Sequence, residues 1–359
     1  MLTDSLSSLF GGRPSTLIGV DVATTSIKLV ELSGRNGKFQ LERYAIESLP
    51  KDFVQDGNIT NIDQVGAILK RGLKRLGSSS KTVALALPSA VAITKRITVP
   101  ADQKEDDLEL TVEAEANQSI PFPLDEVNLD YWVVGPAPNM PGEVEVLIAA
   151  ARKEKVDDIV ALAESAGAKV QVVDIESLAV QNAFAAMSSS LPGKARGQNV
   201  ALFDMGSQNT HFYVFHNREM LFSRELDFGG NQLTIEIQRA FGLPQAEAEA
   251  AKKGGGLPDS YKKDVLKPFI ENLSMEIARA LQFFSTTTTY GQIQQIVLAG
   301  GCALIPGLEK AVAKQTGLTV TTANPFALMK VAGRVRAQQL SQDASLLLTA
   351  CGLALRSFE

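Results

Sequence analysis

The chain has 359 residues, of which 45% are hydrophobic and 21% are charged, and its net charge is −5. This composition suits a globular protein with a sizeable core, and a mildly acidic chain without a basic block is a poor candidate for nucleic-acid binding. Met1–Gly12 lacks the pattern of a secretory leader and no stretch reaches the ~20 apolar residues of a spanning helix, so we expect a cytoplasmic protein that reaches a membrane only through a partner.

Three short apolar segments open the chain and predict an antiparallel meander, because tight polar turns join them. We expect these strands at Leu17–Val22, Ile27–Leu32 and Phe39–Glu47. The spacing of apolar residues then predicts a helix over Ile62–Leu76, and a buried type of strand is expected over Thr82–Leu87.

An inserted module is predicted between residues 90 and 152. A strand at Val91–Val99 precedes a helix that opens at Asp102 with an acidic first turn and runs to Ser119. Strands at Val127–Val134 and Val144–Ala151 follow, on either side of a Pro/Gly loop. The order strand, helix, strand, strand is that of a small α+β unit.

Helix and strand alternate again after the module, and a polar linker at Ser188–Gly197 predicts a boundary between two lobes. The elements expected before that linker are a helix at Lys155–Ala166, a strand at Lys169–Ile175 and a helix at Leu178–Met187. Those expected after it are strands at Asn199–Asp204, Thr210–His216, Met220–Asp227 and Gln294–Ala299, and helices at Gly229–Phe241, Gln245–Lys253, Val265–Tyr290, Leu308–Thr316 and Ser345–Ser357.

The second lobe repeats the start of the first. Ile18–Ser26 and Ala201–Asn209 each contain an apolar strand, an aspartate, one spacer, a small residue and then hydroxyl or amide residues. The two aspartates, Asp21 and Asp204, are separated by about half the chain. The sequence therefore predicts an α/β protein with two duplicated lobes that face each other across a cleft.

Each of these turns has the chemistry of an anion site. Backbone N–H groups of a tight turn point into a concavity, small residues let a phosphate approach, and hydroxyl groups donate further hydrogen bonds. An aspartate at each strand end can hold the water shell of Mg²⁺. Either turn alone could be an ordinary hairpin, and Lys28 could be a solvated strand lysine, but two turns in register predict a clamp for a polyphosphate.

At these residues the chain resembles the actin-like ATPase superfamily, whose fold is a duplicated ribonuclease H-like α/β fold and whose ligand is ATP with Mg²⁺. The residues that resemble its first phosphate motif are Asp21, Ala23, Thr24, Thr25, Ser26 and Lys28. Those that resemble its second phosphate motif are Asp204, Gly206, Ser207, Gln208, Asn209 and Thr210. Those that resemble its adenosine motif, within Val297–Gly307, are Gly300, Gly301, Cys302, Ala303 and Pro306.

The resemblance implies further contacts with the nucleotide. Glu249 and Lys252 match the helical pair that contacts ribose in relatives similar to the division protein FtsA, although such a pair can also be a surface ion pair. Gly229 and Gly230 match a Gly-Gly near the nucleotide, where a helix N-terminus favours phosphate. Asp21 and Asp204 are expected to hold Mg²⁺ through water.

Catalysis is expected to be slow at most. Glu176 stands in the first of two expected connecting helices, at the place that lies near the attacking water in chaperone relatives, and Gln208 is a second candidate. Ala23 replaces the glycine that is usual in the first loop, and its methyl group crowds a phosphate. Gly352 is expected to let the second connecting helix pack closely. Cys302 lies in an apolar run, as does Cys351, which favours two buried thiols over a disulfide.

Over nearly its whole length the chain resembles the PilM family of type IV pilus assembly proteins. The most specific string runs from Glu113-Ala114-Glu115 through Ile120–Val127 to Asp130-Tyr131. The resemblance implies a role in the inner-membrane platform that assembles pili for twitching motility. It also implies that the groove between the first lobe and residues 90–152 binds the short N-terminal tail of a PilN-like membrane protein, with other platform proteins and motor ATPases as further partners.

The expected division of the chain follows from these elements. The first lobe comprises residues 1–89 and 153–190, the module 90–152, the second lobe 191–340 with a helical part at about 229–290, and the C-terminal connecting helix 341–359. Two alternatives remain: a filament-forming protein like FtsA, disfavoured because the chain ends at Glu359 without an amphipathic tail, and a small-molecule kinase, disfavoured because no added catalytic aspartate is found.

Overall fold

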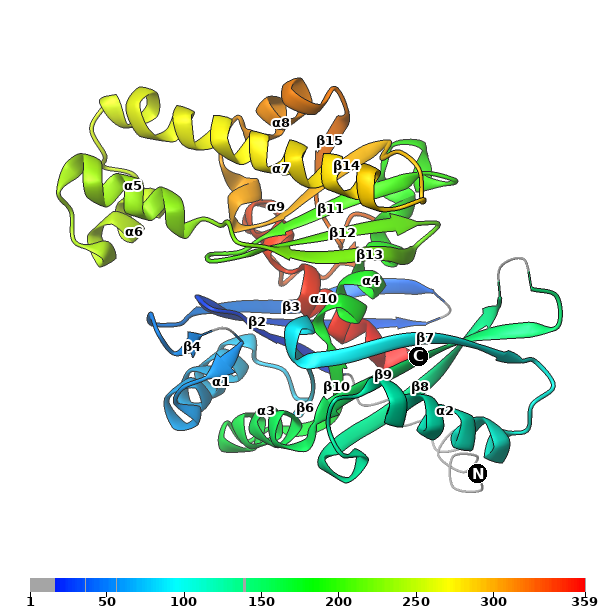
Figure 1. The fold of residues 1–359 in the computed structure, drawn as a ribbon. Coiled ribbons are helices and arrows are strands. Elements are labelled where there is room, and N and C mark those ends of the chain that lie inside the picture. The colour runs from blue at the N-terminus through cyan, green and yellow to red at the C-terminus, as the bar shows by residue number, and fades with distance from the viewer. Residues whose placement is uncertain (1–16, 36, 56, 138–139, 359) are drawn as a thin grey trace.

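The computed structural model describes residues 17–35, 37–55, 57–137 and 140–358. They form two lobes, one above the other in Figure 1, and a smaller module beside the lower lobe. The predicted absence of a leader at Met1–Gly12 concerns residues outside this described part. Within the described part, no helix combines the length and the apolar character that crossing a membrane requires.

The lower lobe is built on a six-stranded sheet. β1, β2 and β3 form the predicted antiparallel meander, and β6 and β10 continue the sheet in parallel with β1. In spatial order the strands are β10 (Lys169–Ile175), β6 (Thr82–Leu87), β1 (Ile18–Val22), β2 (Ser26–Arg35), β3 (Lys38–Ser48) and β16 (Lys330–Val331). A separate small hairpin joins β4 (Val54–Gln55) to β5 (Asn58–Ile59).

The upper lobe has a five-stranded sheet with the same topology. In spatial order its strands are β13 (Glu219–Leu226), β12 (Thr210–His216), β11 (Asn199–Met205), β14 (Gln295–Gly300) and β15 (Thr319–Thr322). As in the lower lobe, three antiparallel strands are followed by two parallel ones. The predicted duplication is therefore present in the backbone, and Asp21 and Asp204 lie at equivalent positions of the equivalent strands β1 and β11.

Helices cover the outer face of each sheet. α1 (Ile62–Leu76) has the predicted bounds because Asn61 accepts a hydrogen bond from the Gln64 N–H at its start and Gly77 takes a left-handed conformation at its end. α3 (Lys153–Ser165) packs beside α1 over a shared core with the lower sheet. The helices of the upper lobe are α5 (Asn231–Phe241), α6 (Gln245–Gly254), α7 (Lys267–Thr287) and α8 (Leu308–Thr316).

Two helices lie between the sheets (Figure 1). α4 (Glu176–Met187) leaves the lower sheet and packs under the upper one, where Phe184 stacks on Phe215 with ring centroids 4.1 Å apart. α10 (Leu348–Leu355) returns from the upper lobe and packs against β1 and β2. The pair matches the two predicted connecting helices, although the second is shorter than expected because 3-10 turns flank it.

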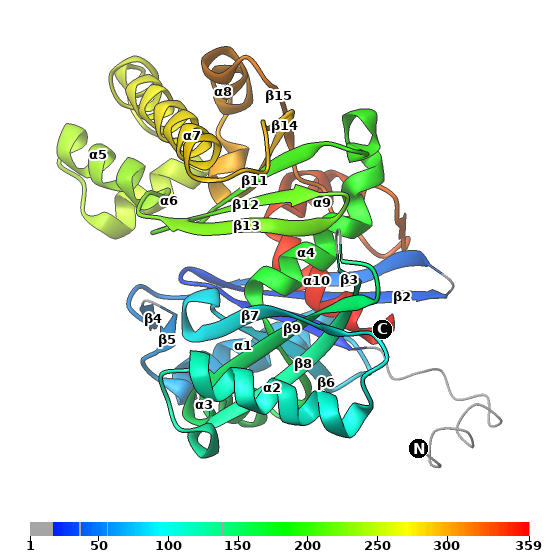
Figure 2. The same cartoon turned by 45° about the vertical axis from the view of Figure 1, so that its right-hand side comes forward.

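The module has the predicted order of elements. They are β7 (Ala92–Pro100), α2 (Glu105–Ser119), β8 (Val127–Pro136) and β9 (Glu143–Arg152), and the sheet order is β7-β9-β8. α2 covers one face of this sheet over a core that includes Leu108 and Val146. Figure 2 shows the module beside the lower lobe, with β7 passing below α4 and β13.

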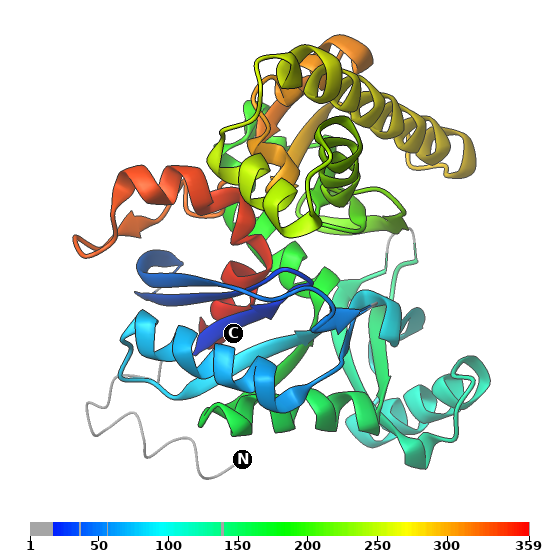
Figure 3. The ribbon, with the colours of Figure 1, turned by 90° about the vertical axis from the view of Figure 1, so that its left-hand side faces the viewer.

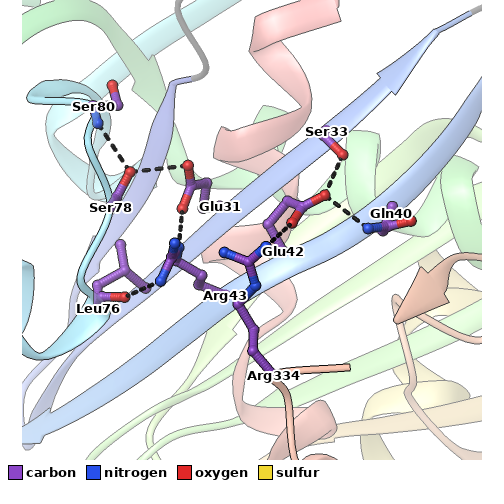
Figure 4. Close-up of polar contacts among 9 residues, drawn as sticks. All are labelled: Glu31, Ser33, Gln40, Glu42, Arg43, Leu76, Ser78, Ser80 and Arg334. Carbon is purple, nitrogen blue, oxygen red and sulfur yellow. Dashed lines mark hydrogen bonds and ion pairs between the residues drawn. The ribbon is translucent and has the colours of Figure 1, made fainter. Parts of the chain in front are cut away.

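The chain returns to the lower sheet before its last helices. Lys330 pairs with Gln40, which places β16 on the open edge of β3, and α9 (Ala337–Asp343) follows. Arg334 lies 3.5 Å from Glu42 of β3 (Figure 4). Residues 330 and 331, which the sequence placed in the second lobe, are therefore part of the first sheet.

Candidate functional site

The first turn brings a lysine against an aspartate. Asp21 and Lys28 are directly opposite each other in the β1–β2 pair, and their side chains form an ion pair with 2.7 Å between Nζ and Oδ2. Only 12% of the Lys28 side chain is exposed, so the alternative of a solvated strand lysine is wrong. The turn between them closes through a hydrogen bond from the Ala23 N–H to the Ser26 carbonyl.

Carboxylates on other elements also change the pKa of Lys28. Burial lowers the pKa of Lys28, but the charges of Asp21, Asp204 and Glu176 outweigh burial and raise this pKa above its ordinary value. Asp204 belongs to the upper sheet and Glu176 opens α4, so the lysine of the lower lobe lies near an acidic group of the upper lobe and one of a connecting helix. The turns of the two lobes thus share one buried electrostatic environment.

The second turn is closed by its own backbone. The Gly206 N–H donates to the Asn209 carbonyl at 3.0 Å, and the side chain of Asn209 donates to a carboxylate oxygen of Glu225 on β13. The hydroxyl of Thr210 is fully buried and donates to the Phe228 carbonyl at 2.7 Å. Thr210 therefore serves the fold of the turn, and the Gly206 N–H is likewise engaged within the turn.

His211, which the sequence motifs did not indicate as a site residue, lies beside the acidic residues. Its Nε2 lies 3.9 Å from Glu176 Oε1, and its Nδ1 lies 4.0 Å from Glu225 Oε2. Burial raises the pKa values of Glu176 and Asp204, and the nearby basic side chains of Lys28 and His211 counteract part of that rise. A carboxyl that holds its proton to higher pH can serve as a general base near neutral pH.

The duplication could have revealed this histidine. His211 pairs with Asp204 across β11 and β12 as Lys28 pairs with Asp21 across β1 and β2. Lys28 and His211 each follow the paired aspartate by the same number of residues. Aligning the two predicted hairpins residue by residue would therefore have placed His211 opposite Asp204.

The glycines after β14 lie against the second turn. Gly300 has φ +77°, and a Cβ there would lie 2.4 Å from the Met205 carbonyl oxygen and 2.7 Å from Asp204 Oδ1. Glycine is required at this position both for its conformation and for the close approach of β14 to the aspartate. Gly301 and Ala303 follow in a 3-10 turn that leads toward α8.

Cys302 and the start of α5 meet on the other side of that turn. The Cys302 thiol is 3.9 Å from the Gly206 carbonyl oxygen, and burial raises its pKa to about 11. The Gly230 N–H also donates to that carbonyl, at 3.0 Å. A Cβ on Gly229 would lie 2.5 Å from the Ser207 carbonyl oxygen. The Gly-Gly pair therefore supports the turn, and the Gly230 N–H is not open to a phosphate in this conformation.

Glu249 and Lys252 of α6 belong to the same assembly. Their ion pair measures 2.7 Å, and the Lys252 ammonium donates to the Gly230 carbonyl at 3.1 Å. Burial raises the pKa of Glu249, but hydrogen bonds and charge from Lys252 outweigh it and lower this pKa to about 2. The pair ties α6 to the start of α5, so it is more than a surface ion pair.

Several of the predicted nucleotide-binding residues are exposed to solvent, among them Thr25, Gln208 and Pro306. Asp21 already pairs with Lys28, and among residues 17–35, 37–55, 57–137 and 140–358 no group of three or more His, Cys, Asp or Glu side chains is arranged for a metal. Any Mg²⁺ here would therefore depend on water and phosphate oxygens for most of its ligands, as this ion usually does.

A separate cavity of about 210 Å³ lies between the module and both lobes. Trp132 and Leu147 line it from the module, Leu178 from α4, and Glu219 and Met220 from β13. Trp132 is 70% exposed, which is unusual for so large an apolar side chain. The cavity combines apolar walls with a few polar groups.

Comparison with known proteins identifies the family. The family described as type IV pilus assembly protein PilM matches residues 19–358. The chain belongs to the PilM family of type IV pilus assembly proteins. A chain of the PilM-PilN type IV pilus biogenesis complex is 26% identical, with a TM-score of 0.80 over 97% of this chain and 100% of that one.

Two further comparisons place the PilM family among its relatives. The cell division protein FtsA of Streptococcus pneumoniae serotype 2 (strain D39 / NCTC 7466) is 24% identical over 86% of this chain and 75% of its own length. The ethanolamine utilization protein EutJ from Carboxydothermus hydrogenoformans is 17% identical, with a TM-score of 0.56 over 95% of this chain and 90% of that one, which shows the fold alone. The predicted actin-like, two-lobed α/β fold is confirmed.

Proposed function

We propose that this PilM-family protein binds ATP with Mg²⁺ between its lobes and acts as a scaffold in type IV pilus assembly. The observation that carries the proposal is the environment of Lys28. This lysine pairs with Asp21 within the lower sheet, and the carboxylates of Asp204 on the upper sheet and Glu176 on α4 also act on its charge. A buried lysine among carboxylates is poised to exchange an aspartate partner for a phosphate, and Mg²⁺ would neutralise the remaining charge.

Each predicted contact has a proposed role. The first turn, Ala23–Ser26, would hold the terminal phosphates with Lys28. The second turn would hold them from the upper lobe with Ser207, where Gly206 has no side chain to obstruct a phosphate. Gly300–Ala303 would receive the adenosine, with Glu249 and Lys252 near the ribose. Glu176, assisted by His211 in place of the exposed Gln208, would position water, so hydrolysis would be slow and Mg²⁺-dependent.

The affinity for Mg·ATP of wild type and Asp204→Ala tests this proposal. Removal of a carboxylate that faces Lys28 across the cleft should weaken Mg·ATP binding by at least about tenfold, since a charged hydrogen-bonding group at the ion contributes about 1.5–3 kcal/mol. Asp259→Ala, which removes an exposed carboxylate far along the second lobe, should bind like wild type. Equal affinities of all three proteins, measured by calorimetry with folding verified by circular dichroism, would refute the pocket.

We further propose that the cavity beside Trp132 receives the cytoplasmic N-terminal tail of a PilN-like membrane protein. What supports this is its position between the first lobe and residues 90–152, together with the similarity to a chain of the PilM-PilN complex. An exposed tryptophan beside Leu147 and Leu178 suits the anchor residue of an extended peptide. The protein would then lie in the cytoplasm and reach the inner membrane through this tail.

A further inference from the structure

A basic edge runs along the side of the first lobe where β16 joins β3. Arg35 and Lys38 form the last register pair of the β2–β3 hairpin, and Lys330 pairs with Gln40 two residues along β3. Arg334 and Arg336 follow in the segment between β16 and α9. All five cationic side chains belong to exposed residues, and we call this set the β16 edge.

Acidic side chains near this edge are already engaged. Glu42 accepts hydrogen bonds from Ser33 and Gln40 and also pairs with Arg334 (Figure 4). Asp343 accepts a hydrogen bond of 2.9 Å from the Tyr44 hydroxyl. The edge is therefore locally positive on a protein whose net charge is −5. At physiological salt, ions screen electrostatic interactions beyond about 8 Å. A ligand at this edge therefore interacts with the nearby positive charges and not with the net negative charge of the whole protein.

Two aliphatic side chains project from the same edge. Leu328 is 58% exposed and Val331 is 41% exposed, while their neighbour Met329 packs inward and Ala332 is buried. The segment is held in place because the Ala332 N–H donates to the Leu41 carbonyl at 2.9 Å. Figure 3 shows the segment that contains β16 projecting from the molecule on the side away from the module.

We propose that the β16 edge binds the surface of an anionic membrane directly. Its lysines and arginines would contact lipid phosphates, and Leu328 and Val331 would enter the boundary between headgroups and acyl chains. This contact would orient the protein at the membrane in addition to any tail held in the cavity, and it needs no spanning helix. It does not depend on ATP binding or on the partner tail.

The chemistry of the edge favours lipid over other anions. Single-stranded nucleic acid bound without sequence preference is held by aromatic side chains on which bases stack, whereas the exposed large apolar side chains of this edge are both aliphatic. A duplex would contact the cations through its phosphates but would make no use of the aliphatic side chains. An acidic protein surface would match the charges but would leave Leu328 and Val331 unexplained. Exposed aliphatic residues flanked by lysine and arginine are typical of surfaces that lie in a membrane interface.

Sedimentation of the full chain with vesicles tests this proposal. Vesicles that contain about 30% phosphatidylglycerol in phosphatidylcholine should bind the protein, with affinity that falls as salt is raised, and pure phosphatidylcholine vesicles should not. Lys38→Glu with Lys330→Glu should reduce binding at least about tenfold. Lys310→Glu with Lys314→Glu on α8 is the matched control: it removes two exposed lysines, gives the same net charge, and should bind like wild type.

A second pair of variants tests the apolar contribution. Leu328→Ser should weaken vesicle binding by about threefold to tenfold, whereas Leu110→Ser, at a 65% exposed leucine of α2, should have no effect. Thermal melting verifies folding, and Lys38→Gln with Lys330→Gln replaces the charge reversal if that protein unfolds. Binding to uncharged vesicles, equal losses in the two lysine pairs, or equally tight and equally edge-dependent binding of a DNA duplex would overturn the proposal.

Discussion

At the scale of single residues, the space between the lobes holds more carboxyl groups than basic side chains. Asp21, Glu176 and Asp204 meet there with Lys28 and His211. Burial raises the pKa of Glu176 above its ordinary value of 4.5, which means that ionisation of this side chain costs folding free energy. Such a cost is typical of binding sites, where stability is exchanged for readiness to bind a charged ligand.

Glu176→Gln should therefore stabilise the protein at pH 8. The folded pKa of Glu176 lies above the unfolded one, so wild type loses stability as pH rises from about 4.5 through the folded pKa, and glutamine avoids this loss. We expect a melting temperature about 2 °C above wild type at pH 8, and a difference that shrinks as pH is lowered toward 4.5. Glu236→Gln, at an exposed glutamate of α5, should melt like wild type at both pH values. A variant that melts below wild type at pH 8 would contradict the sign.

At the scale of elements, close backbone contacts bind the connecting helices to each other and to the first sheet. A Cβ on Gly352 of α10 would lie 1.7 Å from the Ala179 carbonyl oxygen of α4, and one on Gly19 of β1 would lie 2.1 Å from the Ala350 carbonyl oxygen. Neither contact leaves space for a methyl group. Any hinge motion between the lobes must therefore keep the contact among α10, α4 and β1 or shift it only slightly.

Gly352→Ala should destabilise the protein by about 2–4 kcal/mol, because the added methyl group overlaps backbone atoms rather than a side chain that could rotate away. Gly254→Ala is the control, since that helical glycine of α6 has nothing within 4 Å of the added Cβ. The control should be neutral or stabilised by up to about 1 kcal/mol. Urea unfolding measures both, and equal stability of Gly352→Ala and wild type would mean that α10 and α4 separate easily.

At the scale of the whole molecule, the cavity beside Trp132 is lined by three separate parts. The module supplies Trp132 and Leu147, α4 supplies Leu178, and β13 of the upper lobe supplies Met220. A change in the angle between the lobes must alter the distance between Met220 and the module. Because the proposed nucleotide lies between the lobes, its binding and that of a tail should be coupled.

Mg·ATP should therefore change the affinity for a PilN-type tail peptide, by about fivefold or more in either direction, and the peptide should change the affinity for Mg·ATP by the same factor. Trp132 is the single tryptophan of the chain and lines the cavity, so its emission reports peptide binding without a label. Met220→Ala should reduce the coupling, whereas Met275→Ala, at an exposed methionine of α7, should leave it unchanged. If both variants lose the coupling equally, the coupling does not pass through Met220. If the peptide binds without changing the emission of Trp132, the peptide does not occupy this cavity.

Local pattern alone determined the elements that carry their own periodicity. Four elements have the predicted bounds: the helix at Ile62–Leu76 and the strands at Thr82–Leu87, Lys169–Ile175 and Thr210–His216. Their apolar spacing and the residues that end them lie within one short stretch of sequence, so no distant residue is needed to predict them. The repeated aspartate turns likewise predicted two lobes from the sequence. These features depend on residues that are neighbours in the chain.

Tertiary structure alone decided the features that depend on distant partners. β16 is a strand only because the open edge of β3 accepts Lys330 and Val331, and β15 forms because β14 lies beside Thr319–Thr322. His211 reaches Glu176 only when α4 packs beneath the upper sheet. Two or four residues carry too little periodicity to predict a strand, and no pattern along a chain contains the distance between two side chains that the fold brings together.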